Sequence, residues 1–585
     1  MNLQDLITAP WLGSDASPHR APFTRLDLAF AQYCHLQQPS DRVAHRWLAA
    51  LTSHQWGRGH ACLDLQHWPP DAADHPLGWA TTALQSLPED LVEALDDLPW
   101  VEGDASPLVR EGLRLYLRRA WEAEQTIRQH LRARMAQPME PPEGLWAQLA
   151  LPEPNGSAPV DALQNQACAH VASHALTLIT GGPGTGKTTT VRRLIRLWQA
   201  TLSRPLRVVL TAPTGKAAAR LTQAVSQPMG LPQESPSASW APAQTLHRWL
   251  LTASATPPEG EAPDLVVVDE ASMVDLALMA RLLQAVPPSS RLVLLGDKDQ
   301  LASVEAGAVM AQLCAGTWLA SHTLHLQKSH RFNAEEGIGA WARAANTGQA
   351  SAMATLWEAA PEGCWVDQAV VSRITRRQPH DEATLQTLVQ HWQPWQHALQ
   401  AFQTAQAHVD DTQALALLAD FTRLGLLCAV REGPWGVQRF NHRLQKALGF
   451  PDSTWFVGRP VMARRNDPHL GIMNGDLGLC LPRRIDGETR LRVAFAHASG
   501  GVNWQVPSRL DDVDTVFAMT VHQSQGSEFE KVLLIVPNTA SPILTRELIY
   551  TGMTRARQRL AVWAPEPEVL FHAVSRQVRR SGGLA

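Results

Sequence analysis

Short aliphatic runs alternate with stretches of helical spacing between about residues 160 and 335 of this chain. The runs with the length of buried strands are Ala175 to Thr180, Arg207 to Thr211, Leu265 to Val268 and Leu292 to Leu295. Apolar strands separated by helices are typical of a parallel sheet. Aliphatic runs of the same kind occur again later in the chain, at Val516 to Thr520, Val532 to Val536 and Leu560 to Trp563. The pattern therefore predicts an α/β fold with two parallel-sheet domains.

The first 150 residues differ from this pattern. They lack strand-like alternation and carry helical spacing, clearest from Leu108 to Trp121, where apolar residues recur at intervals of three and four. We expect a helical domain there. A segment with the composition of a linker, Pro152 to Pro159, follows it, and we place a domain boundary at this point.

A third kind of composition lies between about residues 452 and 512, where Gly, Arg, Asn and Asp are frequent and the strands are short. It favours a small β insertion, of SH3-like type, in the second α/β domain. The stretch 365–415 is helical and polar, and its residues suggest no role. We expect a helical domain at 1–150, a first α/β domain at 151–350, and a second at 351–585 that contains the insertion.

Composition narrows the class of protein. The 585 residues are more than one core accommodates, and 45% hydrophobic with 18% charged residues is ordinary for a globular protein. A net charge of −4 argues against coating nucleic acid by bulk charge, so nucleic-acid contacts must come from local sites. Seven scattered cysteines without a C-x-x-C pair indicate neither a zinc site nor a disulfide framework. Without a leader-like or membrane-spanning run, we expect a cytoplasmic protein with no membrane contact.

A phosphate-binding loop connects the first predicted strand to a helix that begins near Thr189. Its residues are Gly181-Gly182-Pro183-Gly184-Thr185-Gly186-Lys187-Thr188, and we expect the next residue, Thr189, to contact the nucleotide as well. Glycines let backbone amides converge on phosphate oxygens, while Lys187 reaches the β and γ phosphates and Thr188 ligates Mg²⁺. The loop by itself predicts a binder of ATP or GTP with Mg²⁺.

Two later strands end in polar residues at the same predicted sheet edge. Asp269 and Glu270 follow the strand Leu265 to Val268, where Asp269 can hold Mg²⁺ and Glu270 can orient the attacking water. Gln300 follows the next strand and could sense the γ-phosphate. The spacing from the phosphate loop makes these residues the second half of a hydrolytic site.

The ordered segments resemble the motifs of superfamily-1 helicases from about residue 160 to 565. Besides the segments above, the match comprises Asn165 to Ala167, Thr211 to Ala218, Ser329 to Phe332, Thr520 to Phe529 and Tyr550 to Arg557. Within that superfamily the chain most resembles the RecD family, the α subunits of RecBCD enzymes (exodeoxyribonuclease V). The sequence segments that show this narrower resemblance are Gly59 to Leu65, Leu115 to Arg119, Thr245 to Arg248 and Val461 to Gly478.

The resemblance implies roles for further residues. Gln166 would read adenine, and Arg331 and Arg555 would contact the γ-phosphate across a cleft between the two α/β domains. Gln525 and Gly526 would border the same site. Single-stranded DNA contacts are implied at four short polar side chains, Thr214, His247, Thr520 and His522. Arg557 is better interpreted as a surface arginine.

The resemblance implies an ATP-dependent 5′→3′ single-stranded DNA translocase and helicase. It would act with RecB-like and RecC-like subunits in a heterotrimer that unwinds and resects double-stranded DNA ends, with residues 1–150 docking on the RecC-like partner. We expect the nuclease site in another subunit. The alternatives are a free-standing superfamily-1 DNA helicase, a structural subunit with an inactive motor, and an RNA helicase, because backbone contacts alone do not separate DNA from RNA.

Overall fold

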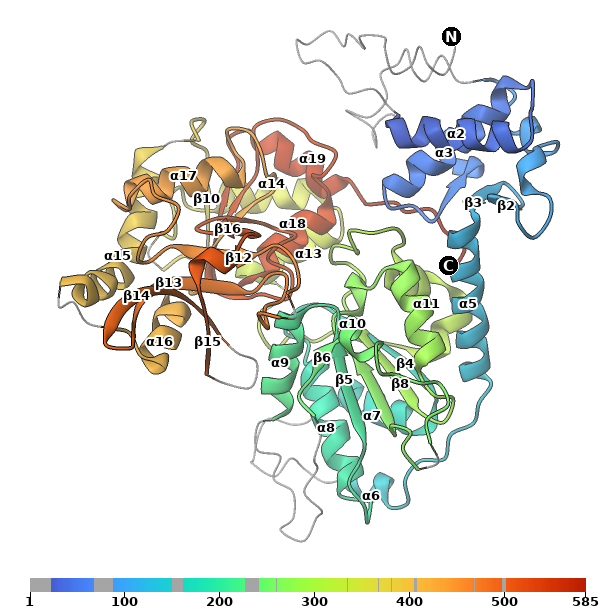
Figure 1. Ribbon diagram of the computed structural model, residues 1–585, viewed down its shortest axis with the longest axis horizontal. Helices are drawn as coiled ribbons and strands as arrows, with labels where there is room; N and C mark the ends of the chain where they lie inside the picture. Colours follow the sequence, from blue (N-terminus) through green and yellow to red (C-terminus); the bar gives the residue numbers. More distant parts are fainter. Residues whose placement is uncertain are drawn as a thin grey trace.

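A six-stranded parallel sheet with the order β6-β5-β7-β8-β4-β9 forms the first α/β domain in the computed structural model of this protein (Figure 1). The structure describes residues 23–67, 88–149, 161–226 and 241–585, apart from 259, 334, 367, 380, 405–407, 468 and 497–500. The predicted linker at 152–159 lies outside these residues. The strands are β4 (Leu176–Gly181), β5 (Val208–Ala212), β6 (Gln244–Thr245), β7 (Leu265–Val268), β8 (Arg291–Gly296) and β9 (Thr323–Leu326).

Alternate side chains of this sheet enter two separate cores. Val267 packs with the helices α7 (Ala162–Ser173), α8 (Lys187–Gln199) and α9 (Gly215–Val225) on one face. Val266 packs with α11 (Leu276–Ala285) and α12 (Val309–Ala315) on the other. The strands are apolar on both faces because both faces are covered by helices.

The N-terminal region contains a sheet that the sequence did not predict. Its helices are α2 (Arg25–Gln37), α3 (Val43–Gly57) and α5 (Arg118–Met135). Between α3 and α5, the antiparallel strands β1 (Cys62–Asp64), β3 (Arg114–Leu117) and β2 (Leu108–Glu111) pair in the order β1-β3-β2. The helical prediction for Leu108 to Leu117 was therefore wrong, because Gly112, with φ +63°, makes a tight turn between β2 and β3.

The N-terminal region shares its core with the first α/β domain. Helix α5 runs beside α11 (Figure 1), and residues from α3, α5, β7 and β8 belong to one hydrophobic cluster. The buried guanidinium of Arg134, at the end of α5, donates to the carbonyl oxygens of Val286 and Ser290 at 2.6 and 2.9 Å. A cut near residue 150 would consequently leave apolar surface of the first α/β domain without its cover.

A five-stranded parallel sheet with the order β10-β19-β18-β11-β17 forms the second α/β domain. Its strands are β10 (Val371–Ile374), β11 (Leu424–Cys428), β17 (Met519–Thr520), β18 (Phe529–Ile535) and β19 (Ala556–Trp563). One face is covered by α13 (Gly337–Asn346), α14 (Ala350–Ala359), α18 (Arg546–Thr554) and α19 (Pro567–Ser575). The other is covered by α15 (Glu382–Thr404), α16 (Asp411–Phe421) and α17 (Val437–Ala447). The stretch 365–415 thus supplies an edge strand and a covering helix.

The β insertion is an antiparallel sheet with the order β15-β14-β13-β12-β16. Its strands are β12 (Pro460–Ala463), β13 (Leu477–Ile485), β14 (Glu488–Ala496), β15 (Val502–Gln505) and β16 (Val513–Thr515). Asp486 and Gly487, with φ of +51° and +84°, form the tight turn between β13 and β14. The expected strand at Val516 to Thr520 begins later, at Met519. The predicted fold class is confirmed, with two α/β domains, an N-terminal helical region and a small β insertion.

The segment Arg576–Ala585, here called the return segment, runs from the second α/β domain back to α5 (Figure 1). Leu584 is fully buried in the core shared by the N-terminal region and the first α/β domain. Trp318 Nε1 donates to its carbonyl oxygen at 2.9 Å, and Ala61 N donates to Ser581 O at 2.8 Å. The return segment therefore ties the second α/β domain to the rest of the chain.

No helix within the described ranges is both long and apolar enough to cross a membrane.

Candidate nucleotide site and nucleic-acid interface

The phosphate loop joins β4 to α8 at the carboxyl end of the first sheet. Gly184 and Gly186 have φ of +77° and +83°, a left-handed conformation that favours glycine, and Gly186 is the N-cap of α8. The Lys187 ammonium donates to Gly181 O at 2.5 Å and Gly182 O at 3.1 Å. The Lys187 charge is therefore held over the loop, where phosphate oxygens would bind.

The glycines of the loop allow neighbouring segments to approach it closely. A Cβ at Gly184 would lie 2.5 Å from Arg331 Cβ, and one at Gly182 would lie 2.9 Å from the Tyr550 hydroxyl. Any side chain there would push away the second domain or the Ser329 to Phe332 segment. Thr188 and Thr189 both lie in the first turn of α8, where Thr188 is partly exposed and Thr189 is exposed.

Acidic side chains gather where β7 and β8 end. Burial and the neighbouring charge of Glu270 raise the pKa of Asp269 to about 6. Glu270 has φ +52°, which is uncommon for a residue with a side chain and is typical of backbone held for a functional reason. Asp297, which the sequence analysis missed, is buried and accepts hydrogen bonds from Gln300 Nε2 at 2.9 Å and the Tyr550 hydroxyl at 3.0 Å. Its position directly after Gly296 matched that of Asp269 after β7.

Arg555 brings the second α/β domain into this site. It caps the C-terminus of α18, and its guanidinium is buried with only 3% of the residue exposed. Arg555 Nη2 donates to Gln300 Oε1 at 2.7 Å, and Gln525 Nε2 donates to Leu301 O at 3.1 Å. Burial lowers the pKa of Arg555, while the charge of Glu270 opposes that shift. Arg555 and Gln525 of the second α/β domain thus contact Gln300 and the adjacent Leu301 of the first.

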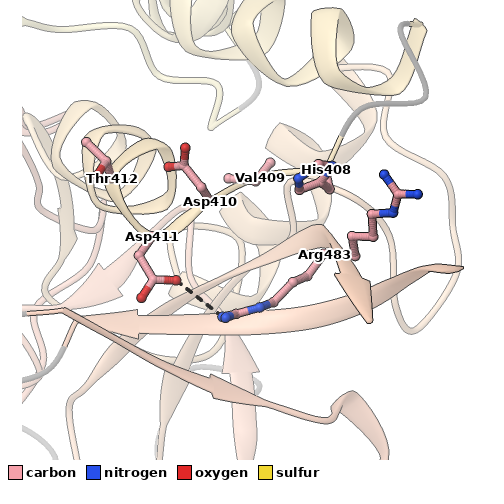
Figure 2. Close-up of a pocket in the computed structure, with 7 residues that line it drawn as sticks. His408, Val409, Asp410, Asp411, Thr412 and Arg483 are labelled. Carbon is pink, nitrogen blue, oxygen red and sulfur yellow. Dashed lines mark ion pairs between the residues drawn. The ribbon is translucent and has the colours of Figure 1, made fainter. Parts of the chain in front are cut away.

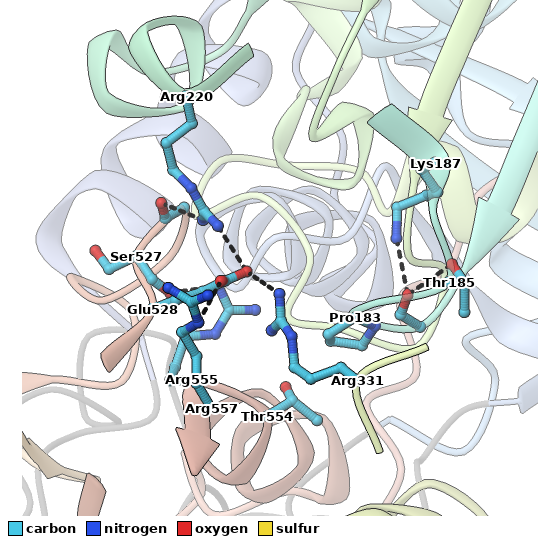
Figure 3. A network of polar contacts seen from close by, with 12 residues as sticks. Pro183, Thr185, Lys187, Arg220, Arg331, Ser527, Glu528, Thr554, Arg555 and Arg557 are labelled. Carbon is cyan, nitrogen blue, oxygen red and sulfur yellow. Dashed lines mark hydrogen bonds and ion pairs between the residues drawn. The ribbon is translucent and has the colours of Figure 1, made fainter. Parts of the chain in front are cut away.

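Arg331 also faces the second domain, but through a carboxylate that the sequence analysis did not single out. Its Nη2 donates to Glu528 Oε1 at 2.7 Å, and Arg220 of α9 lies 2.6 Å from the same oxygen (Figure 3). Arg220 Nη1 also donates to Gly526 O at 2.9 Å. Burial favours the neutral acid, but the two arginines outweigh it and lower the pKa of Glu528 to about 2.

Gln164, rather than Gln166, lies against the phosphate loop. Gln166 is exposed, whereas Gln164 is buried, and its Nε2 lies 3.5 Å from Thr185 O and 2.4 Å from where a Cβ of Gly186 would stand. Residues two apart on a helix point in different directions, so only one of the two glutamines of α7 can face the loop. The exposed Gln166 thus has no hydrogen bond to the described residues of the loop, and Gln164 is the glutamine of α7 that faces it.

Of the four residues predicted to contact DNA, Thr214 and His247 belong to the first α/β domain, and Thr520 and His522 belong to the second. The Thr214 hydroxyl accepts from Ala217 N at 3.2 Å as the N-cap of α9, and it lies 3.7 Å from where a Cβ of Gly526 would stand. The Thr520 hydroxyl accepts from Gln523 N at 3.1 Å. His247 is exposed in α10 (Leu246–Trp249), and burial together with Arg580 lowers the pKa of His522. Both threonine hydroxyls thus accept a hydrogen bond from the backbone N–H three residues further along the chain.

A further polar pocket lies away from the cleft, between α16 and the insertion (Figure 2). Asp411 pairs with Arg483 at 3.3 Å and accepts from Trp504 Nε1 at 2.7 Å, so these charges are satisfied within the protein.

Family models match three parts of the chain. They describe the N-terminal domain of the RecBCD enzyme subunit RecD over residues 19–116, an AAA domain over 159–361, and a UvrD-like helicase C-terminal domain over 515–563.

Individual relatives extend these matches to most of the chain. The RecBCD enzyme subunit RecD of Mycolicibacterium smegmatis is 39% identical over 84% of this chain and 87% of that protein. The subunit from Haemophilus influenzae is 30% identical and covers 92% of both chains. The ATP-dependent RecD2 DNA helicase of Deinococcus radiodurans is also 30% identical, over 82% of this chain but 59% of its own length. Bacteroides Pif1 helicase in complex with ADP-AlF3 and ssDNA aligns with 69% of this chain and 92% of that one, at 17% identity and a TM-score of 0.37.

A nucleotide site shared by two parallel-sheet domains distinguishes superfamily-1 helicases from many other phosphate-loop proteins, and the contact between Gln300 and Arg555 gives this chain that arrangement. The protein is an ATP-dependent DNA helicase of that class. The sequence identity with the Mycolicibacterium and Haemophilus subunits identifies the family within this class. The chain belongs to the RecD family of RecBCD enzyme subunits.

Proposed function

We propose that the protein is a 5′→3′ single-stranded DNA translocase and helicase, the α subunit of a RecBCD-type enzyme that resects double-strand breaks. The observation that carries this proposal is the 2.7 Å hydrogen bond from Arg555 to Gln300, which joins the two domains at the phosphate loop. A residue pair that spans the cleft can convert nucleotide chemistry into relative domain movement.

In the proposed hydrolytic cycle the first domain holds the nucleotide and the second completes the site. Lys187 binds the β and γ phosphates, and Glu270 orients the attacking water. Gln300 senses the γ-phosphate, while Arg331 and Arg555 stabilise its developing charge. Mg²⁺ held by the Thr188 hydroxyl and the Asp269 carboxylate would neutralise charge on the phosphate oxygens. These oxygen ligands suit Mg²⁺.

We assign recognition of the base to Gln164. Its side chain lies next to the loop, whereas Gln166 is directed to solvent. Gln525 and Gly526 border the site from the second domain, and the Gln525 bond to Leu301 O supports that placement.

Single-stranded DNA is proposed to follow the cleft opening past Thr214, His247, Thr520 and His522. Short polar side chains at loop ends bind phosphates without reading bases. The closeness of Thr214 and Gly526 supports a path that both α/β domains contact.

An apolar face of α2 supports docking of the N-terminal region on a partner. Leu26, Tyr33 and Leu36, exposed at 73, 51 and 69%, recur at helical spacing on this helix. Apolar residues exposed along one helix face are typical of protein interfaces. We propose a RecC-like subunit as the partner, with a RecB-like subunit supplying the nuclease. A cytoplasmic location and domain boundaries near residues 150 and 350 remain predictions.

Two experiments test this proposal. Unwinding of partial duplexes should require ATP and a 5′ single-stranded tail, and unwinding from a 3′ tail alone would contradict the polarity. Affinity purification from cells should recover RecB-like and RecC-like chains with the native protein. Leu26→Ser/Leu36→Ser should lose them, whereas Leu251→Ser, which alters a leucine that is 80% exposed on the first domain, should retain them. Native protein that purifies alone and still unwinds DNA would favour a free-standing helicase.

A further inference from the structure

The backbone of Arg331 lies against the phosphate loop, and its guanidinium contacts the second α/β domain. His330 N donates to Gly184 O at 2.8 Å, which fixes this segment against the loop. The Arg331 guanidinium reaches across the cleft to Glu528. One side chain thus connects the segment packed against the phosphate loop to the Glu528 carboxylate of the second α/β domain (Figure 3).

Glu528 holds Arg220 through the same carboxylate oxygen. The side chain of Glu528 is 17% exposed, so an unpaired charge there would be costly. Arg220 comes from α9 and also donates to Gly526 O, so its position does not depend on Arg331. Arg557 is a poor substitute, because its Nε lies 4.0 Å from Glu528 and its side chain is 62% exposed.

We propose that Glu528 competes with bound nucleotide for Arg331, and that Arg220 keeps Glu528 neutralised when Arg331 turns to the γ-phosphate. Glu528 and Arg220 are positioning residues, since they act on the nucleotide through Arg331. The inference rests on the proposed contact of Arg331 with the γ-phosphate. It explains why two arginines share one oxygen of Glu528, of which only Arg331 comes from the segment packed against the phosphate loop.

Competition predicts that loss of the Glu528 charge and loss of the Arg220 charge change the affinity for nucleotide in opposite directions. Loss of the Glu528 charge frees Arg331, so nucleotide should bind more tightly. Loss of Arg220 leaves Arg331 as the main counter-charge of Glu528, so nucleotide should bind more weakly. If the ion pair only stabilised the fold, loss of either charge would weaken nucleotide binding.

The test is isothermal titration of the full chain with Mg–AMP-PNP. Glu528→Gln should lower Kd about fivefold and Arg220→Gln should raise it about fivefold, the size expected for partly exposed charge pairs. Arg331→Gln/Glu528→Gln should match Arg331→Gln, because the competing cation is already absent. Arg557→Gln is the matched control, and its Kd should equal that of the wild type.

Shifts of Kd in the same direction for Glu528→Gln and Arg220→Gln would overturn the proposal. If Glu528→Gln fails to fold, Arg220→Gln becomes the test. It must weaken nucleotide binding when Arg331 is present and have no effect when it is combined with Arg331→Gln. Any other result rejects competition. A wild-type chain that binds no Mg–AMP-PNP would instead reject the proposed nucleotide site itself.

Discussion

Arg555 and Gln300 are 255 residues apart in the chain, yet the Arg555 guanidinium donates a 2.7 Å hydrogen bond to the Gln300 side chain. Gln300 in turn donates to Asp297, which also accepts from Tyr550 of the second domain. Two of these buried polar contacts, Arg555 to Gln300 and Tyr550 to Asp297, cross the cleft and would be lost if it opened, so the polar side chains beyond β8 respond to the position of the second domain.

Arg555→Ala is expected to lower kcat for ATP hydrolysis by a factor on the order of 10³, as for other arginines that complete a phosphoryl-transfer site. KM should change much less, since the guanidinium acts mainly on charge that develops in the transition state. Steady-state kinetics with saturating single-stranded DNA would measure both. Equal losses in kcat and in nucleotide affinity would make Arg555 a ground-state ligand instead.

Gln164→Ala should raise the KM for ATP about tenfold, the cost of one lost hydrogen-bonding side chain at a nucleotide. Gln166→Ala is the paired control, and its KM should remain near the wild-type value because that side chain is exposed. Kinetics of the two variants under one set of conditions separates the positions. The reverse order would return base recognition to Gln166.

Leu584→Ala should destabilise the protein by about 2–4 kcal/mol, as expected when a fully buried leucine leaves a cavity. The change should appear as a lower melting temperature in calorimetry, because the return segment holds the second domain against the shared core. Leu251→Ala, which alters an exposed leucine, serves as the control. Unchanged melting of Leu584→Ala would show that the return segment contributes nothing to stability.

His170 should make stability fall in mild acid. Burial and the neighbouring His174 ring lower the pKa of His170 to about 4, below its ordinary value of about 6.5. Folding therefore disfavours protonation, and the stability that the neutral ring provides is present above pH 6.5 and is lost as the pH falls toward 4. His170→Gln should have a flatter dependence of melting temperature on pH across this window. An unchanged slope would assign the acid sensitivity to other groups.

The sequence predicted the parts of the fold that depend on local pattern. β7 has the predicted bounds, and the phosphate loop, Asp269 and Gln300 all follow strands of one parallel sheet, because such strands present their carboxyl ends at one edge. The hairpin at Leu108 to Leu117 was missed because a short apolar run fits either period until Gly112 is recognised as a turn. Gln164 and Gln166 could not be separated without the direction of α7, and the pairing of Arg220 with Glu528 depends on how the two domains meet.

ATP hydrolysis by Lys187→Gln tests the central claim most directly. The wild-type chain should hydrolyse ATP slowly alone and much faster with single-stranded DNA. Lys187→Gln should show no DNA-stimulated hydrolysis while keeping its melting temperature, because the ammonium faces the phosphate loop rather than a hydrophobic core. Near-normal turnover in this folded variant would contradict a motor driven from the cleft between the two α/β domains.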